Sequence, residues 1–158
     1  MRTYADSSFL LRLVTGESGT EQAVGEYRRL DRPRLFCLSL HALEVENAVR
    51  QRAFHERPTR PSGDRAQIRR ARDAALARLT QYRQRDAFLE VALDMDAAMD
   101  RARGLSTAHT DRLGARAIDV LHVACALMLE SEVFLTLDER QRELAKAEGL
   151  QVLDLCPV

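Results

Sequence analysis

Four acidic residues spread along the chain are the candidates for chemistry: Asp6, Glu44, Asp119 and Asp138. If they converge, like charges about 4 Å apart repel by roughly 4 kcal/mol per pair at an effective dielectric near 20, so the cluster either protonates or recruits cations. Oxygen ligands alone favour the hard ions Mg²⁺ or Mn²⁺ over zinc. One or two such ions can activate a bound water and neutralise charge on a leaving oxygen, which is the chemistry of phosphodiester hydrolysis without a protein nucleophile.

Asp119 is the most informative of these positions. It lies near the start of residues 118–128, a run in which the other polar residue is His122. A helix that is apolar on almost every side must be largely buried, and an ionised carboxylate there is costly unless it is paired, hydrogen-bonded or metal-bound. A place in the first helical turn gains some helix-dipole stabilisation. We expect Asp119 to be functional; His122 could hydrogen-bond it, although we favour a satisfied core histidine.

Two of the carboxylates follow predicted strands. Asp6 comes after residues 2–5, and Asp138 comes after residues 133–137. The carboxyl edge of a parallel sheet is where ligands bind in α/β proteins, so we expect both carboxylates at one edge. Helix capping is an equally good account of each residue taken alone, because a side-chain oxygen of Asp6, Ser7 or Asp138 could accept a backbone N–H of the following helix.

Glu44 lies in a predicted helix at residues 40–53. Its face begins apolar, with Leu40 and Leu43 nearby. A glutamate on a helix is usually exposed to solvent, so the pattern by itself favours a structural interpretation. Glu46 is expected to point to solvent, but it would replace Glu44 at the cluster if the helix were rotated.

The elements that must position these residues alternate short β-like runs with helical ones. Candidate strands are residues 2–5, 35–38, 133–137 and 150–153. This alternation is typical of an α/β domain with a central, mainly parallel sheet, here of four to five short strands flanked by helices. A chain of 158 residues is about one domain's worth.

A strong charge asymmetry accompanies this pattern. Residues 51–85 carry ten basic and three acidic groups, and residues 86–158 carry seven and fourteen. The breaker-rich stretch 56–64 predicts a surface loop, and residues 64–85 predict a helix with one apolar face and arginines on the others. Guanidinium groups suit RNA phosphates, and the candidates for contact are Arg65, Arg69, Arg70 and Arg72. A solvated helical hairpin, or a surface that meets an acidic partner, is the alternative.

Composition argues against several classes of protein. The three cysteines, Cys37, Cys125 and Cys156, are odd in number and lack metal-binding spacing, which argues against a disulfide framework and a zinc site. The longest apolar run, residues 120–129, is far shorter than the roughly twenty residues of a membrane-spanning helix, and the N-terminus lacks a signal peptide's apolar core. We therefore expect a cytoplasmic protein that does not enter a membrane.

Two other families place an aspartate after the first strand. Haloacid-dehalogenase-like phosphatases need a second acidic residue two positions on, where this chain has Ser8. Receiver domains need a lysine after a later strand, and the single lysine, Lys146, belongs to a predicted helix. Both interpretations are disfavoured.

Four stretches resemble the PIN-domain ribonucleases, and within them the VapC-type toxins of bacterial toxin-antitoxin pairs. They are residues 4–11, 40–49, 116–127 and 134–141, the last followed by Ala145 and Gly149-Leu150. Their order and spacing match the family across nearly the whole chain, whereas residues 51–105 resemble it only in helical character.

This resemblance implies a PIN-like fold and a single domain over residues 1–158 that carries a basic helical segment at about 51–85. It implies that the four acidic residues hold one or two Mg²⁺ or Mn²⁺ ions, with Ser8 and Thr136 as polar neighbours. It further implies RNA cleavage by a homodimer that a small antitoxin of the VapB type restrains. From a different class, a catalytically inactive PIN-like module that binds RNA or an antitoxin is the alternative.

Overall fold

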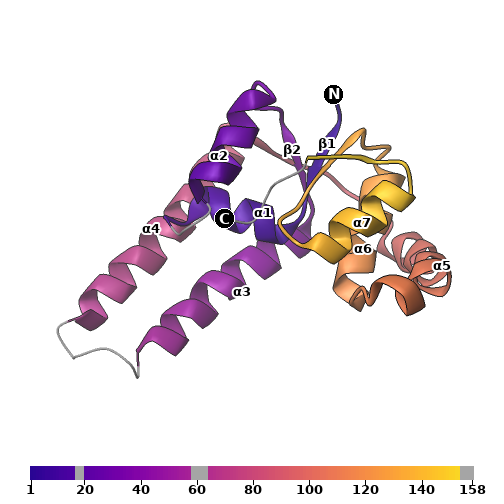
Figure 1. Ribbon diagram of the computed structural model, residues 1–158. Coiled ribbons are helices and arrows are strands. Elements are labelled where there is room, and N and C mark those ends of the chain that lie inside the picture. The colour runs from indigo at the N-terminus through magenta and orange to yellow at the C-terminus, as the bar shows by residue number, and fades with distance from the viewer. Residues whose placement is uncertain (17–19, 58–63, 154–158) are drawn as a thin grey trace.

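The computed structural model describes residues 1–16, 20–57 and 64–153, and in this part of the chain five strands and seven helices alternate (Figure 1). In chain order they are β1 (Thr3–Ala5), α1 (Ser7–Val14), α2 (Thr20–Arg29), β2 (Leu35–Cys37), α3 (Ser39–Glu56), α4 (Arg65–Gln84), β3 (Phe88–Glu90), α5 (Met95–Leu113), α6 (Ala117–Met128), β4 (Val133–Leu135), α7 (Glu139–Ala147) and β5 (Gln151–Val152).

The strands form one sheet in the order β3-β2-β1-β4-β5, and every neighbouring pair is parallel. The expected α/β class and central parallel sheet are therefore confirmed. The hydrophobic pattern does not predict β3, because Phe88–Glu90 is only three residues long and ends in a charged side chain. Each of the five strands is only two or three residues long. Because β1 is the middle strand, the acidic residue that follows it lies at the middle of the carboxyl edge of the sheet.

Alternate strand residues feed two hydrophobic cores, one on each face of the sheet. Tyr4 and Phe134 join the core that includes α5, α6 and α7, whereas Ala5 and Leu135 join the core beneath α1 and α2. Successive strand side chains point to opposite faces, so this separation follows from the period of two in a strand. Because both faces are covered, the central strands β1 and β4 are buried along their whole length, as in other parallel sheets.

The helices that lead into β2, β3, β4 and β5 end in the same way. In each, the backbone turns back on the last helical turn with a residue in the left-handed conformation: Asp31 (φ 62°), Asp86 (φ 53°), Glu130 (φ 50°) and Gly149 (φ 82°). At α4, for example, the N–H of Asp86 bonds the carbonyl of Arg83 and the N–H of Ala87 bonds that of Tyr82. This is the Schellman arrangement, which satisfies helix carbonyls and redirects the chain into the sheet.

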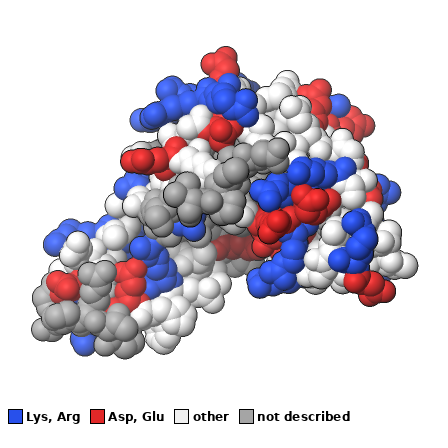
Figure 2. Space-filling model, viewed as in Figure 1, with Lys and Arg blue, Asp and Glu red and all other residues white. Residues whose placement is uncertain are grey.

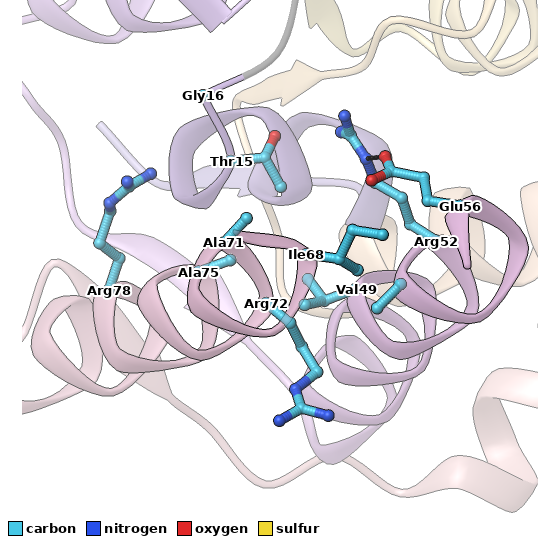
Figure 3. Close-up of a pocket in the computed structure, with 11 residues that line it drawn as sticks. Thr15, Gly16, Val49, Arg52, Glu56, Ile68, Ala71, Arg72, Ala75 and Arg78 are labelled. Atoms are coloured by element: carbon cyan, nitrogen blue, oxygen red, sulfur yellow. Dashed lines mark hydrogen bonds and ion pairs between the residues drawn. The ribbon is translucent and has the colours of Figure 1, made fainter. Parts of the chain in front are cut away.

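The far halves of α3 and α4 extend side by side from the body of the molecule as an arm (Figure 1). Between them and the end of α1 lies a groove of about 250 Å³ whose walls carry Val49, Ile68 and Ala75 (Figure 3). Part of the loop predicted at residues 56–64 lies outside the described residues. Helix α4 matches the predicted basic helix within a residue at each end.

None of the described helices is both long enough and apolar enough to cross a membrane. Cys37 and Cys125 are buried free thiols, and Cys156 lies outside the described residues.

Candidate active site

Asp6 stands at the carboxyl end of the central strand and is buried, with 1% of its surface exposed. Its carboxylate accepts the N–H of Phe9 at 2.9 Å, which makes it the N-cap of α1. The hydroxyls of Ser8 (2.8 Å) and Thr136 (2.9 Å) donate to it as well. Asp6 therefore caps the helix and also joins a polar network at the carboxyl edge of the sheet, so capping does not exclude a role of Asp6 in a site.

Thr136 links Asp6 to Asp138. Its hydroxyl donates to Asp6 and accepts the N–H of Asp138 at 3.0 Å. Asp138 is the N-cap of α7, and its Oδ1 accepts the backbone N–H groups of Arg140 and Gln141 at 2.8 and 3.1 Å. The two strand-end carboxylates thus sit on adjacent strands, β1 and β4, and share one threonine.

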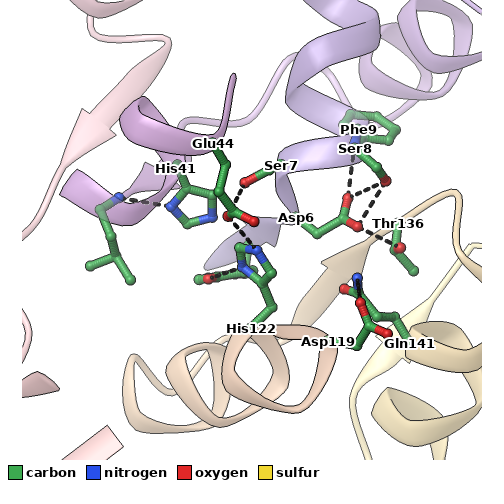
Figure 4. A network of polar contacts seen from close by, with 12 residues as sticks. Asp6, Ser7, Ser8, Phe9, His41, Glu44, Asp119, His122, Thr136 and Gln141 are labelled. Carbon is green, nitrogen blue, oxygen red and sulfur yellow. Dashed lines mark hydrogen bonds and ion pairs between the residues drawn. The ribbon is translucent and has the colours of Figure 1, made fainter. Parts of the chain in front are cut away.

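Asp119 lies in the first turn of α6 and is 5% exposed. One oxygen accepts the N–H of Arg116 at 2.9 Å, and the other accepts the side-chain amide of Gln141 at 3.0 Å. Because the backbone N–H of Gln141 donates to Asp138, this single glutamine ties two carboxylates together. Asp6, Asp119 and Asp138 therefore belong to one hydrogen-bonded cluster, in which Figure 4 shows Asp6, Thr136, Asp119 and Gln141 side by side.

Glu44 approaches from α3, on the other side of Asp6 (Figure 4). Its Oε2 accepts the hydroxyl of Ser7 at 2.6 Å and contacts Nε2 of His122 at 2.9 Å. Glu46 points away and forms an ion pair with Arg50 at 2.8 Å. The helix is therefore rotated so that Glu44, and not Glu46, faces the cluster.

The face of α3 that carries apolar residues differs from the expected one. The core positions are His41, Val45 and Val49, whereas Leu43, expected near Glu44 on an apolar face, is 68% exposed. Glu44 lies at the border of the buried stripe, which lets its carboxylate reach inward while its stem stays half-buried.

His122 is a buried histidine with both ring nitrogens engaged. Nδ1 lies 2.8 Å from the hydroxyl of Tyr4, and Nε2 lies 2.9 Å from Glu44. When Glu44 is ionised, the Nε2 proton donates to it, and Nδ1 then accepts the Tyr4 hydroxyl. The favoured interpretation of a satisfied core histidine agrees with these contacts, but its acidic partner is Glu44 on α3 rather than Asp119 one turn away on its own helix.

Burial shapes the charges of this network. It raises the pKa of Asp6, and the charge of His122 together with the donors around the carboxylate offsets only part of this effect. Burial acts in the same direction on Glu44, but the hydrogen bond and charge of His122, with the Ser7 hydroxyl, hold its pKa below the ordinary value. Glu44 is thus poised as an anion, whereas Asp6 lacks a cation that would neutralise it fully.

The neighbouring histidine of α3, His41, stays neutral. Burial and the proximity of His122 lower its pKa to about 3. Its Nδ1 accepts the N–H of Leu38 at 2.9 Å, and its buried Nε2 has no hydrogen-bond partner among the described residues.

The donors at this edge are those that a hard divalent cation prefers, namely carboxylates with two hydroxyls beside them. The buried Asp6 carboxylate, which is surrounded by neutral hydroxyl and N–H donors, fits a site that a cation would complete. In the part of the chain that the structure describes, no three Asp, Glu, His or Cys side chains are gathered around one point closely enough to hold a metal ion together.

Sequence reasoning missed three participants: Ser7, Tyr4 and Gln141. Gln141 had a readable signal, because an acidic N-cap followed three residues later by Gln is a helix-start signature. Tyr4 had none, since an aromatic residue in a buried strand reads as core. It does pack in the core, stacked on Phe134 with ring centroids 5.5 Å apart, while its ring lies against that of His122 and its hydroxyl bonds the same histidine.

The four arginines predicted to contact RNA lie on α4. Arg65, Arg69 and Arg70 are exposed, whereas Arg72 is partly buried and forms an ion pair with Asp73 at 2.8 Å. Figure 2 shows both signs of charge on the arm, so it is not a uniformly basic surface.

Comparison with known proteins adds a family. Residues 3–147 match the sequence model of the PIN domain. A search of curated proteins finds none that this chain matches.

Proposed function

Because this chain belongs to the PIN domain family, whose fold is generally that of a nuclease, we propose that it is a metal-dependent endoribonuclease. The observation that carries the proposal is the cluster of Asp6, Asp119 and Asp138. Three carboxylates from different elements are linked through Thr136 and Gln141 at the sheet edge where α/β proteins bind ligands. Capping accounts for Asp6 and Asp138, and Asp119 also accepts the N–H of Arg116, the N-cap residue of α6. Capping does not account for the second bond of the buried Asp119, which its other oxygen accepts from the side chain of Gln141, three residues after Asp138.

In this proposal, Asp6, Asp119 and Asp138 hold Mg²⁺ or Mn²⁺, and Glu44 binds or positions the ion from α3. When bound, the metal supplies an activated water and neutralises charge on the leaving oxygen. The hydroxyls of Ser8 and Thr136 fix the orientation of the Asp6 carboxylate.

The protein's own contribution is orientation. Each carboxylate is held by at least one hydrogen bond from a neighbouring group, which limits its rotation before any ligand binds. His122 does the same for Glu44, because it is itself fixed by Tyr4 from the opposite ring nitrogen. A rigid set of donors lowers the cost of ordering the site around a phosphodiester.

The exposed Arg65, Arg69 and Arg70 have no ion-pair partner among the described residues, so they are available to RNA phosphates. We further propose a role as the toxin of a pair in the cytoplasm, acting as a homodimer and held by a small antitoxin of the VapB type. The exposed Leu43 and Phe54 on α3, at 68% and 63%, are apolar surface that such contacts would cover.

The test is cleavage of a structured RNA by the purified protein with Mn²⁺ or Mg²⁺, with EDTA, and with the Asp119→Asn variant. We expect metal-dependent cutting that EDTA abolishes and that the variant loses by roughly a hundredfold or more, the scale of losing one preorganised electrostatic group at a catalytic centre. Asp111→Asn, on the exposed surface of α5, removes the same charge away from the site and should cut like the wild type. Cutting without metal, or full activity of Asp119→Asn, contradicts the proposal.

A binding module without catalysis is the second candidate. It is favoured by the observation that, among the described residues, the carboxylates are held by hydroxyl, amide and backbone donors and no three of them surround one point. Binding of many RNAs with no cutting of any of them, under both metals, would support this candidate over the nuclease.

A further inference from the structure

Two helices end on the same short sequence. Tyr-Arg-X-X-Asp occurs at residues 27–31, where α2 ends, and again at residues 82–86, where α4 ends. In both copies the aspartate takes the left-handed conformation before the chain enters a strand, and after α2 the next residue, Arg32, is left-handed as well (φ 51°). Because β2 and β3 are parallel neighbours, the two turns lie next to each other, and the N–H of Leu35 bonds the carbonyl of Ala87 at 2.9 Å between them.

Together the two turns enclose a hollow of about 340 Å³ at the amino edge of the sheet. Its polar lining comes from four arginines, two tyrosines and one glutamine: Arg28, Arg32, Arg78, Arg85, Tyr27, Tyr82 and Gln81. Two apolar residues, Val24 and Ala87, complete the wall, and no acidic residue lines it. Figure 2 shows Lys and Arg side chains gathered over the carboxyl end of α2, at the top of the view.

Many arginines of this protein are paired with a nearby acidic residue. Arg29, Arg50 and Arg103, for example, form ion pairs with acidic residues on their own helices. Arg28, Arg32 and Arg85 form no ion pair with any residue that the structure describes.

The other polar groups of the hollow are in place to help. Arg78 is held by a bond of 2.7 Å from its guanidinium to the carbonyl of Val14, so it is already oriented. Within the described chain the hydroxyls of Tyr27 and Tyr82 have no hydrogen-bond partner, which leaves two donors in the lining. Unpaired guanidinium groups beside free hydroxyls form the donor set that recognises phosphate oxygens.

A cation near the last turn of a helix also stabilises the helix dipole, and Arg28 is in the last turn of α2. That role does not account for Arg32, which lies beyond the end of α2, or for Arg85, which is the C-cap of α4. At both positions the Schellman bonds already satisfy the last helix carbonyls. It also does not explain why two such turns are placed side by side around a hollow without a counter-charge.

We propose that this hollow binds phosphate groups of the RNA backbone, at the edge of the sheet opposite the carboxylate cluster. The proposal rests on the proposed function, because RNA is its ligand. The central strand β1 is three residues long, about 10 Å, and this length separates the amino edge from the carboxyl edge of the sheet. An RNA held in the hollow therefore passes over the body of the molecule to reach the carboxylate cluster. The hollow therefore selects RNA that is long or folded enough to reach both edges.

The test measures binding rather than cleavage. A labelled structured RNA is titrated with the protein in EDTA, by fluorescence anisotropy, at several salt concentrations. Arg32→Ala/Arg85→Ala removes two exposed charges from the hollow, and Arg101→Ala/Arg103→Ala removes two exposed charges from α5 as the matched control.

We expect the hollow variant to bind roughly tenfold or more weakly, with a salt slope smaller by about 1.5, the value for two lost phosphate contacts. The control should bind within about twofold of the wild type. Equal weakening in both variants, or none in either, overturns the proposal.

Competitors separate the sources of the charge. Inorganic phosphate should displace the labelled RNA only at high concentration, and polyglutamate of similar charge should displace it poorly. If polyglutamate competes as well as unlabelled RNA does, the proposal is overturned in favour of an acidic protein partner. Because EDTA stops hydrolysis, a failure of the nuclease proposal shows itself in the Asp119→Asn assay and leaves this measurement unaffected.

Discussion

At the scale of single residues, the site is defined by what surrounds each carboxylate. Asp6 is buried among neutral donors, and its pKa is raised because burial disfavours the charged form. Burial also raises the pKa of Glu44, but the interactions with His122 and the Ser7 hydroxyl outweigh this effect, so its pKa is lowered. The pKa values of two neighbouring carboxylates are thus shifted in opposite directions by their surroundings, which is common where such groups perform different tasks.

The hydrogen bond between His122 and Glu44 can be tested with two substitutions of His122, one that keeps a donor toward Glu44 and one that removes it. His122→Gln places an amide nitrogen near the position of Nε2 and keeps a donor toward Glu44, whereas His122→Asn places its amide near Nδ1 and loses that donor. We expect His122→Asn to weaken Mn²⁺ binding about 10- to 100-fold, because partners that orient a metal ligand have effects of that size. Calorimetric titration with Mn²⁺ measures it.

His122→Gln should retain most of the affinity. If both variants bind Mn²⁺ like the wild type, then Glu44 is not oriented through His122. Thermal melting of both proteins without metal shows whether a loss of affinity merely reflects loss of the fold.

At the scale of elements, the site depends on where helices begin and where they stop. Asp6 and Asp138 begin α1 and α7, so the groups that could bind a metal also start the helices. The four helices that lead into strands end in a residue with the left-handed conformation, and in three of them this residue is not glycine. A left-handed residue other than glycine costs energy, although aspartate tolerates it better than most.

The left-handed turn after α4 can be tested directly. Asp86→Ala should lower the free energy of unfolding by about 1 kcal/mol, because alanine at φ 53° lacks the local hydrogen bonding that lets aspartate occupy this region. Asp86→Gly should be neutral or slightly stabilising. Urea denaturation measures both, with Asp111→Ala inside α5 as the control, which should lose nothing because alanine favours a helix. A loss in the control as large as in Asp86→Ala would mean that charge, not backbone conformation, is responsible.

At the scale of the whole molecule, a net charge of zero conceals an uneven distribution of acidic and basic groups. The order β3-β2-β1-β4-β5 puts the carboxylates of β1 and β4 together at the carboxyl edge. The same order makes β2 and β3 neighbours, which joins two arginine-bearing turns at the amino edge. In a parallel sheet all strands begin at one edge and end at the other. One strand order therefore decides both which carboxylates meet at the carboxyl edge and which arginine-bearing turns meet at the amino edge.

The stability of the whole protein should depend on pH through His41. Its pKa is about 3 in the folded protein and 6.5 when unperturbed, so between these values the unfolded chain takes up a proton that the folded chain does not. Stability is therefore present above pH 6.5 and is lost as the pH falls toward 3, by at most about 1.4 kcal/mol per pH unit. Between pH 7.5 and 5.5 the free energy of unfolding of His41→Gln should fall by about 1 kcal/mol less than that of the wild type. Urea denaturation at both pH values measures the difference.

His55→Gln is the matched control, because His55 is exposed on the same helix. It should follow the wild type at both pH values. An unchanged pH dependence in His41→Gln would show that His41 is not buried in its neutral form.

The sequence by itself determined the residue types that could do chemistry and the alternation of strands and helices. Apolar periodicity and residues such as Asp119, a carboxylate in an apolar helix, are local signals, because they depend only on neighbours within a few turns. The tertiary structure decided the partners: Glu44 meets His122, 78 residues away, and Tyr4 meets the same ring from 118 residues away. It also joined the turns at Arg32 and Arg85. Contacts of this kind depend on which strands pair and how α3 is rotated, and a pattern of side chains along one segment carries no information on either.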